Sequence, residues 1–146
     1  MADALDLQRL SADTVKMFLE KLGAQILSAV IFGSQIDGRA FGDSDVDILI
    51  VSEDRAPYSL LEKVCRAINM ELTLKYANKV NCIPFQESDI QYMMRRKHPF
   101  LIGIFQNNIL AYDPKGYFQQ TLAEIKRQLE RDEIKIYGKS GLVFVR

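Results

Sequence analysis

The sequence has few of the residues that build disulfide frameworks, zinc clusters and histidine metal sites. Its 146 residues include two cysteines, one histidine, four prolines and no tryptophan. Cys65 and Cys82 are too few for a disulfide framework or a metal cluster, so we interpret them as small buried apolar residues of a reducing compartment. His98 has no second nitrogen or thiolate ligand spaced nearby, and we expect it at the surface or anchoring a loop.

An excess of one charge and long apolar runs are also absent. Nineteen basic and nineteen acidic residues balance to a net charge of zero, which argues against a nucleic-acid partner, since that requires a basic surface. No apolar run approaches the length of a membrane span, and the N-terminus has no signal-peptide pattern. We therefore expect a cytoplasmic protein without a membrane partner. A hydrophobic share of 48% supports an ordinary globular core.

What the sequence does contain is a glycine-rich polar loop between two apolar runs. The runs, residues 26–32 and 46–52, predict neighbouring buried strands, and we expect one short helical turn in the loop between them. Gly33 opens the loop, and without a Cβ atom its backbone can approach a ligand closely. Ser34 follows at the expected start of the helical turn, where free N–H groups and the helix dipole favour a phosphate.

Two aspartates, Asp45 and Asp47, open the second run at alternate positions. Because residues i and i+2 of a strand point to the same side, both carboxylates should lie together on the face opposite Val46 and Ile48. Two carboxylates that close repel each other unless a cation lies between them, and their oxygens suit Mg²⁺ or Mn²⁺. The alternative is an ordinary Gly-Ser turn, with the aspartates as exposed charges on an edge strand.

An apolar residue, Gly-Ser, a spacer of about ten residues and Asp-apolar-Asp together resemble the signature of the DNA polymerase beta-like nucleotidyltransferase superfamily. Within it, the chain is similar to the minimal nucleotidyltransferases (MNT) of prokaryotes. The resemblance implies an α/β (α+β) fold with a small mixed β-sheet backed by helices. It also implies that Asp45 and Asp47 are catalytic and hold Mg²⁺ or Mn²⁺. The nucleotide-binding residues, for ATP or another nucleoside triphosphate, would be Gly33, Ser34, Gly38, Arg39 and Ser44.

The sequence departs from active relatives at Asn81, in the segment 80–83. Those relatives usually carry a third carboxylate there, which completes the metal site and activates the attacking hydroxyl. Asn81 can accept a hydrogen bond but cannot act as a base or bring charge to a metal. Glu71 could replace the carboxylate if residues 70–74 are a strand, and Glu87 or Asp89 could reach in from beyond the strand.

A second departure lies directly after Gly-Ser, where the superfamily often has arginines. Gln35 and Asp37 occupy those positions here, with Arg39 nearby as a replacement.

Two functions follow from the resemblance. In the first, the chain is a metal-dependent enzyme that transfers a nucleotidyl group to a hydroxyl of a partner protein or small molecule, releasing pyrophosphate. In the second, it is a catalytically weak or inactive subunit that acts as antitoxin to a helical HEPN-type protein. Asn81 separates the two, because without a third carboxylate the isolated chain should bind ATP but transfer slowly or not at all.

Helical periodicity and turn residues predict the remaining elements. We expect a helix from Thr14 to Leu22 with Ser11 as N-cap and Gly23 as its end, then a helix over 58–77. Further elements follow: a strand over 79–85 ended by Pro84, a helix over 86–96 capped near Ser88 or just before it, a strand over 109–112 and a helix over 117–131. Residues 99–105 are strongly apolar, and the family resemblance implies a proline-led helix there.

The C-terminal residues predict a β-hairpin, since alternating runs at 134–137 and 142–145 flank a glycine-containing turn. We therefore divide the chain into a nucleotidyltransferase domain, residues 1–132, and a hairpin tail, residues 133–146. We expect the tail and the 117–131 helix to bury a protein interface, most simply that of a homodimer.

Overall fold

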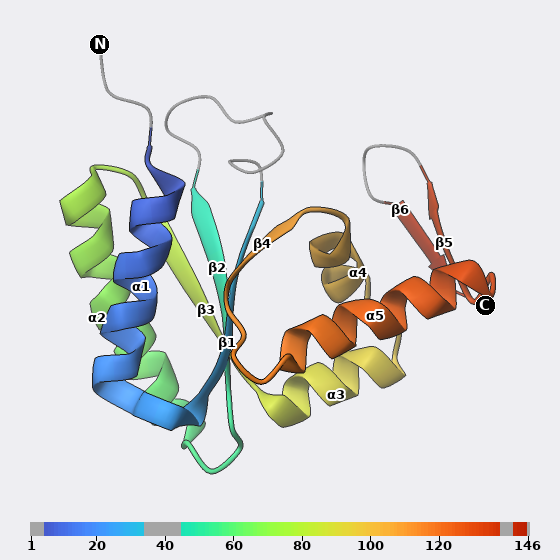
Figure 1. Cartoon of the computed structure of the whole chain (residues 1–146), viewed down its shortest axis with the longest axis horizontal. Helices are drawn as coiled ribbons and strands as arrows, with labels where there is room; N and C mark the ends of the chain where they lie inside the picture. The colour runs from blue at the N-terminus through green and yellow to red at the C-terminus, as the bar shows by residue number, and fades with distance from the viewer. Residues whose placement is uncertain (1–4, 34–44, 138–141, 146) are drawn as a thin grey trace.

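A computed structural model describes residues 5–33, 45–137 and 142–145 (Figure 1). Within these residues, four strands form one sheet in the order β3-β2-β1-β4, namely β1 (Ile26–Phe32), β2 (Val46–Ser52), β3 (Val80–Gln86) and β4 (Asn108–Tyr112). The helices are α1 (Leu7–Leu22), η1 (Gly23–Gln25), α2 (Tyr58–Tyr76), α3 (Glu87–Arg95), α4 (Pro99–Gln106) and α5 (Tyr117–Glu130). A second sheet pairs β5 (Ile134–Tyr137) with β6 (Leu142–Val145). The predicted α+β fold with a small mixed sheet is confirmed.

Helices cover both faces of the four-stranded sheet (Figure 1). One core lies under α1 and α2, and a second lies under α3, α4 and α5. Successive strand residues alternate between them, so that Ile48 and Ile50 enter the first core while Leu49 and Val51 enter the second. This two-sided burial explains the unbroken apolar runs of β1 and β2. Among the described residues, no helix is long and apolar enough to cross a membrane.

The sheet brings distant polar residues to one end. β1 pairs antiparallel with β2 and β4, and β2 pairs parallel with β3. In this register Phe32 lies opposite Asp47, and Asp47 lies opposite Asn81. The end of β1 and the starts of β2 and β3 therefore lie together at one end of the sheet.

α1 begins earlier than the sequence predicted. Its N-cap is Asp6, whose carboxylate accepts a hydrogen bond from the Arg9 backbone N–H at 3.0 Å. Ser11, the predicted cap, lies inside the helix. Thr14 is also internal and buried, and its hydroxyl donates to the Leu10 carbonyl at 2.7 Å, which satisfies the hydroxyl within the helix. The predicted end is correct, since Gly23 follows the helix with φ +56°.

Pro84 lies inside β3 rather than ending it. β3 is at the edge of the sheet, where a proline is tolerated because one side of the strand has no neighbour to bond. The strand therefore continues to Gln86, which caps α3, in agreement with a cap near Ser88 or just before it. The Asp89 carboxylate accepts from the Gln86 backbone N–H at 2.9 Å and completes a capping box.

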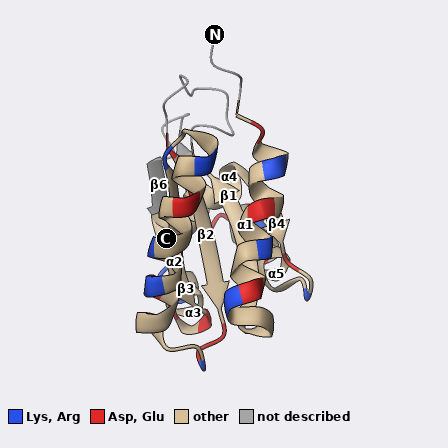
Figure 2. Ribbon diagram, turned by 90° about the vertical axis from the view of Figure 1, so that its left-hand side faces the viewer, with Lys and Arg blue, Asp and Glu red and all other residues tan. Residues whose placement is uncertain are grey.

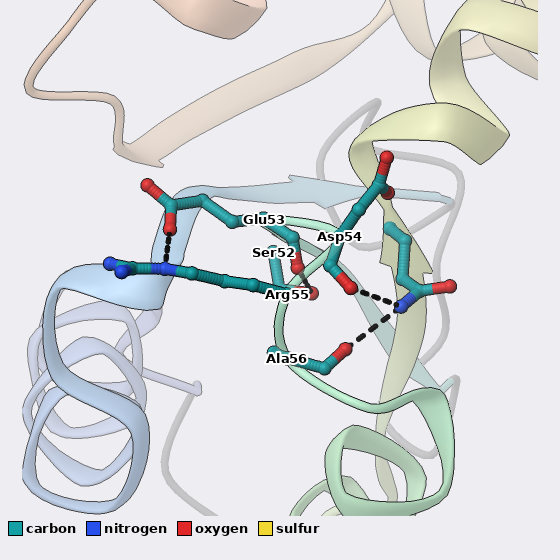
Figure 3. A network of polar contacts seen from close by, with 6 residues as sticks. Ser52, Glu53, Asp54, Arg55 and Ala56 are labelled. Atoms are coloured by element: carbon teal, nitrogen blue, oxygen red, sulfur yellow. Dashed lines mark hydrogen bonds and ion pairs between the residues drawn. The ribbon is translucent and has the colours of Figure 1, made fainter.

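The turn between β2 and α2 is held against the end of β3 by polar contacts (Figure 3). The Gln86 side-chain amide donates to the carbonyl oxygens of Asp54 at 3.3 Å and Ala56 at 2.8 Å. The Asp54 carboxylate accepts from the Ser88 backbone N–H at 3.0 Å. Because Gln86 pairs with Ser52, these contacts lie at the sheet end opposite Asp47.

The predicted C-terminal hairpin is confirmed as an antiparallel pair with Ile134 opposite Val145. Ile134 is 1% exposed and belongs to the core beneath α4 and α5. The apolar seam of α5 faces the same core, with Phe118 and Ile125 fully buried. The apolar face predicted to form a protein interface on α5 is therefore covered by the chain itself.

Candidate functional site

Gly33 ends β1 with φ +102°, a backbone conformation that residues with a Cβ atom rarely adopt. A Cβ atom at this position would lie 3.2 Å from Oδ2 of Asp47, closer than ordinary contact. Both the conformation and the space taken by the carboxylate therefore require glycine here. Gly33 therefore lies beside the Asp47 carboxylate, while the close approach of its backbone to a ligand stays a prediction.

Asp47 is partly buried beside Asn81, as the register of β2 and β3 requires. The Asn81 amide Nδ2 donates to Asp47 Oδ1 over a long 3.5 Å. Burial raises the pKa of Asp47 above its ordinary value, while the hydrogen bond from Asn81 opposes the shift and the nearby Asp45 charge adds to it. Asn81 on β3 thus lies next to the motif aspartate Asp47 on β2.

Aromatic residues lie on the same face of the sheet as Asp47. Phe32 lies directly opposite Asp47 in the antiparallel pair, so both side chains are on one face of the sheet. The Phe100 ring packs edge to face against Phe32 and Phe85, with ring centroids 5.6 Å apart in both pairs. The Phe32 ring of this aromatic cluster is therefore on the same face of the sheet as the Asp47 side chain.

Asp45 precedes β2 and is open to solvent, with 46% of its side chain exposed. The Lys79 ammonium lies 3.7 Å from Asp45 Oδ2, and the Lys79 backbone carbonyl accepts from the Val46 N–H at 2.9 Å. An exposed ion pair of this kind adds little stability, so the lysine leaves Asp45 available to a ligand. We did not predict Lys79 at the site, although its position just before the Asn81 strand was a usable signal.

The structure excludes the three carboxylates considered as substitutes for Asn81. Glu71 lies on α2, not on a strand, and lines a groove of about 350 Å³ with Asp13 and Lys16 of α1. Glu87 and Asp89 begin α3 at the opposite end of the sheet, because β3 runs on through Pro84. In the part of the chain that the structure describes, no three His, Cys, Asp or Glu side chains gather as a metal site.

Four of the predicted nucleotide-binding residues lie outside the described residues, together with the expected helical turn between the two motif strands. They are Ser34, Gly38, Arg39 and Ser44. Their contact with a triphosphate remains a prediction.

Comparison with known proteins agrees with this geometry. The family described as "Polymerase beta, Nucleotidyltransferase" matches residues 13–116, which include Gly33, both motif aspartates and Asn81. The chain belongs to this nucleotidyltransferase family. The resemblance carried by the Gly-Ser and Asp-apolar-Asp motifs is thereby confirmed.

Two relatives of this nucleotidyltransferase are named as adenylyltransferases. A candidate protein adenylyltransferase of Methanocaldococcus jannaschii is 26% identical over 113 residues, which cover 77% of this chain and 76% of that protein. Spectinomycin 9-adenylyltransferase of Staphylococcus aureus is 26% identical over 139 residues, covering 86% of this chain and 51% of that enzyme. The chain thus spans about half the length of the second relative.

Solved structures share the fold at low sequence identity. A chain from the complex of a tri-AMPylated Shewanella oneidensis HEPN toxin with its MNT antitoxin superposes with a TM-score of 0.54 at 11% identity, covering 88% of this chain and 90% of that chain. Spectinomycin adenyltransferase from Enterococcus faecialis, solved with ATP and spectinomycin, gives a TM-score of 0.55 at 12% identity, covering 75% and 57%. At such identities the likeness establishes the fold alone.

Proposed function

We propose that this nucleotidyltransferase binds ATP with Mg²⁺ at the sheet end formed by Gly33, Asp45 and Asp47, and transfers an adenylyl group to a hydroxyl of a partner protein. The apposition of Gly33 and Asp47 carries the proposal, since a Cβ at Gly33 would lie 3.2 Å from the carboxylate. A triphosphate bound along the backbone of this turn would therefore have its phosphates beside a metal-binding oxygen. The adenylyltransferase relatives support the choice of ATP.

The carboxylates fit one Mg²⁺ ion shared with the nucleotide. Mg²⁺ is usually held by one or two carboxylates together with substrate phosphates and waters, and Asp45 and Asp47 supply two. When bound, the ion would neutralise phosphate charge as pyrophosphate leaves. Mn²⁺ takes the same ligands. We propose that Ser34, Gly38, Arg39 and Ser44 hold the triphosphate.

In the proposed transfer, the acceptor oxygen bonds to the α-phosphorus as the bond from that phosphorus to the oxygen bridging the β-phosphate breaks. Pyrophosphate leaves with the bonding electrons, and the acceptor loses its hydroxyl proton. Asn81 cannot take that proton, because a neutral amide is not a base near neutral pH. The proton must pass to solvent or to a group on the partner, so we expect slow transfer by the isolated chain.

Asn81 also favours a second candidate function, in which the chain is a nucleotide-binding antitoxin of a helical HEPN-type protein with little or no transfer of its own. The amide holds Asp47 by its hydrogen bond, which preserves the nucleotide site, while it removes the base. Support for this partner class comes from the fold shared with a chain of the S. oneidensis toxin–antitoxin complex.

The test measures ATP binding by calorimetry and transfer with α-labelled ATP, both with Mg²⁺, for the chain alone and with candidate protein acceptors. We expect Mg²⁺-dependent binding that Asp47→Asn abolishes and Glu87→Gln, at the opposite end of the sheet, leaves unchanged. Binding that survives Asp47→Asn would place the site elsewhere and contradict the proposal. Binding without transfer to any acceptor, even in Asn81→Asp, would favour the second function.

A further inference from the structure

α2 carries an apolar stripe on the side that faces away from the sheet. Leu60, Met70 and Leu74 expose 43%, 69% and 77% of their surfaces, and Ala67 is exposed between them. We call these four residues the α2 stripe. The opposite side of the helix is the buried one, formed by Leu61, Cys65, Ile68 and Leu72. Figure 2 looks onto α1 and α2, where charged bands alternate with tan ribbon.

The stripe has the spacing of a helix-packing surface. Leu60, Ala67 and Leu74 recur every seventh residue, and Met70 lies between the last two, as at the a and d positions of paired helices. Large apolar side chains gathered on an exposed helix face are typical of a protein interface. The small Ala67 at the centre would let a second helix approach closely, because interaxial distance depends on the side chains at the contact.

The charged side chains of α2 bear on which partner could bind the α2 stripe. Three of its charged side chains are paired within the chain: Arg66 lies 3.5 Å from Glu62, and Lys75 lies 2.7 Å from Asp13. The other two, Lys63 and Glu71, are exposed and form no ion pair within the part of the chain that the structure describes.

Lys63 and Glu71 are opposite in sign and stand at equal spacing on either side of Ala67. We infer that α2 binds a second copy of this chain, with the two α2 helices antiparallel about a two-fold axis at Ala67. A two-fold interface is self-complementary, so residues equally far from the axis face each other across it. Leu60 of one copy then faces Leu74 of the other, and Lys63 faces Glu71. Because of the two-fold symmetry, each of these two contacts occurs twice in the dimer.

The chemistry of the stripe favours a second copy over an unrelated helical partner. Binding of an unrelated helix would require only the apolar side chains of the stripe. The symmetric placement of Lys63 and Glu71 about Ala67 has a role only when the partner is a second copy of the same helix. The helix has 19 residues and is therefore about 28 Å long, which places the contact toward the small end of stable interfaces. The dimer should therefore be weak and dependent on concentration. It lies on α2 and is independent of the proposed function.

The first test is sedimentation equilibrium of the full chain up to about 1 mM, which detects weak association. Wild type should pass from monomer to dimer. Leu74→Glu should stay monomeric, because it puts a charge opposite Leu60 of the other copy. Tyr92→Glu on α3, which changes a residue with 50% exposure, should dimerise like wild type. A wild type that is monomeric throughout would overturn the proposal.

A charge swap tests the two-fold pairing itself. Lys63→Glu and Glu71→Lys should each weaken the dimer about tenfold, because like charges then face each other at both ends. The double swap should restore wild-type affinity, while Lys115→Glu, an exposed control before α5, should change nothing. If the single variants weaken association and the double swap fails to restore it, the antiparallel pairing is wrong.

A cysteine at the axis supplies an independent measurement. Ala67→Cys should crosslink between copies under mild oxidation, because the two thiols meet at the two-fold axis. The native Cys65 and Cys82 are 2% and 3% exposed, so the introduced thiol is the reactive one. Gln91→Cys, exposed on α3, is the matched control. Equal crosslinking of both variants would contradict the interface.

Discussion

Asp47 and Asp113 stand at opposite ends of one sheet and differ in how fully the chain satisfies them. The Asp113 carboxylate accepts from the Ser28 hydroxyl at 2.7 Å and from the backbone N–H groups of Phe118 and Gln119, each at 2.9 Å. Within the described residues, the Asp47 carboxylate accepts one hydrogen bond, the 3.5 Å contact from Asn81. The described residues use the acceptor capacity of Asp113 and leave most of that of Asp47 unused.

This is the difference that we expect between a carboxylate that stabilises the fold and one that, as proposed, binds a ligand. α5 starts after Gly116 without a capping side chain at that position, so its first N–H groups need an acceptor. Asp113 provides it and also ties the helix to the fully buried Ser28 of β1. Among the described residues Asp47 stabilises no helix end, and the only hydrogen bond to its carboxylate is the long one from Asn81. Mutation of each aspartate should therefore affect a different property.

The largest expected effect is that of Asp47→Asn on ligand binding and transfer. Losing this carboxylate should remove about 4 kcal/mol of transition-state stabilisation, roughly a thousandfold in any transfer rate. It should also abolish the rise in melting temperature that ATP with Mg²⁺ gives wild type. Without ligand, stability should change by less than about 1 kcal/mol, because among the described residues the substitution alters only a long hydrogen bond. Calorimetry and thermal unfolding measure both properties, and a large loss of ligand-free stability would make Asp47 structural.

Asp113→Ala should have the reverse profile. It leaves the buried Ser28 hydroxyl and two helical N–H groups without their acceptor, so the free energy of unfolding should fall by about 3 kcal/mol. ATP affinity, measured where the variant is folded, should stay unchanged. Denaturant unfolding tests this, with Glu130→Ala at the exposed end of α5 as a control expected within about 0.5 kcal/mol of wild type. Equal losses in both variants would refute the assignment.

The sequence predicted the two motif strands to the residue because their apolar runs stop at Gly33 and Ser52, where chain direction and polarity change together. The start of α1 was missed for a physical reason. Asp6 and Ser11 are both good caps, and the choice depends on tertiary packing, since Leu10 is fully buried and must already be helical. The local sequence alone therefore does not show which of the two residues caps α1, because packing of the helix in the core makes that choice.

The sequence likewise predicted some features of the candidate site and missed others. Asn81 was found from the sequence because the resemblance to active relatives marks the segment 80–83 as the place of their third carboxylate. The close approach of Gly33 to Asp47 depends on the register between strands distant in sequence, which no local signal gives. Lys79, in contrast, could have been found from its place just before the Asn81 strand. Glu87 was a wrong candidate because it lies just beyond the end of β3, and the parallel pairing of β2 with β3 puts that end opposite Ser52, at the far end of the sheet from Asp47.

Asn81→Asp should widen the difference between Asp47 and Asp113, because it adds a general base beside Asp47. Transfer to a suitable acceptor at saturating Mg²⁺ should rise about a hundredfold, the usual contribution of a general base. Asn81→Ala is the matched control and should give no increase, because it removes the amide without supplying a base. Product formation from α-labelled ATP measures both. Fast transfer by wild type that is insensitive to both changes would show that another group serves as the base.

The smallest expected effect is that of Asp13, an aspartate that is neither well enclosed nor held ready for a ligand. Its carboxylate accepts from the Lys75 ammonium at 2.7 Å and from the Tyr76 hydroxyl, joining α1 to the end of α2. These hydrogen bonds, that from Lys75 first, lower the pKa of Asp13 below its ordinary 3.8. Since Lys75 remains 45% exposed, we expect a contribution of only about 0.5 kcal/mol.

The pH dependence of that contribution distinguishes Asp13 from a residue that matters only for packing. A pKa lowered on folding means that the folded state binds the proton less tightly than the unfolded state. The stabilisation is therefore complete above the ordinary value of 3.8 and is lost as the pH falls through the lower folded pKa. Asp13→Asn should melt slightly below wild type near neutral pH, and the gap should close on acidification. Glu20→Gln, exposed on the same helix, should show no such closing gap. A gap that stays constant or widens in acid would mean that Asp13 acts through packing and not through its charge.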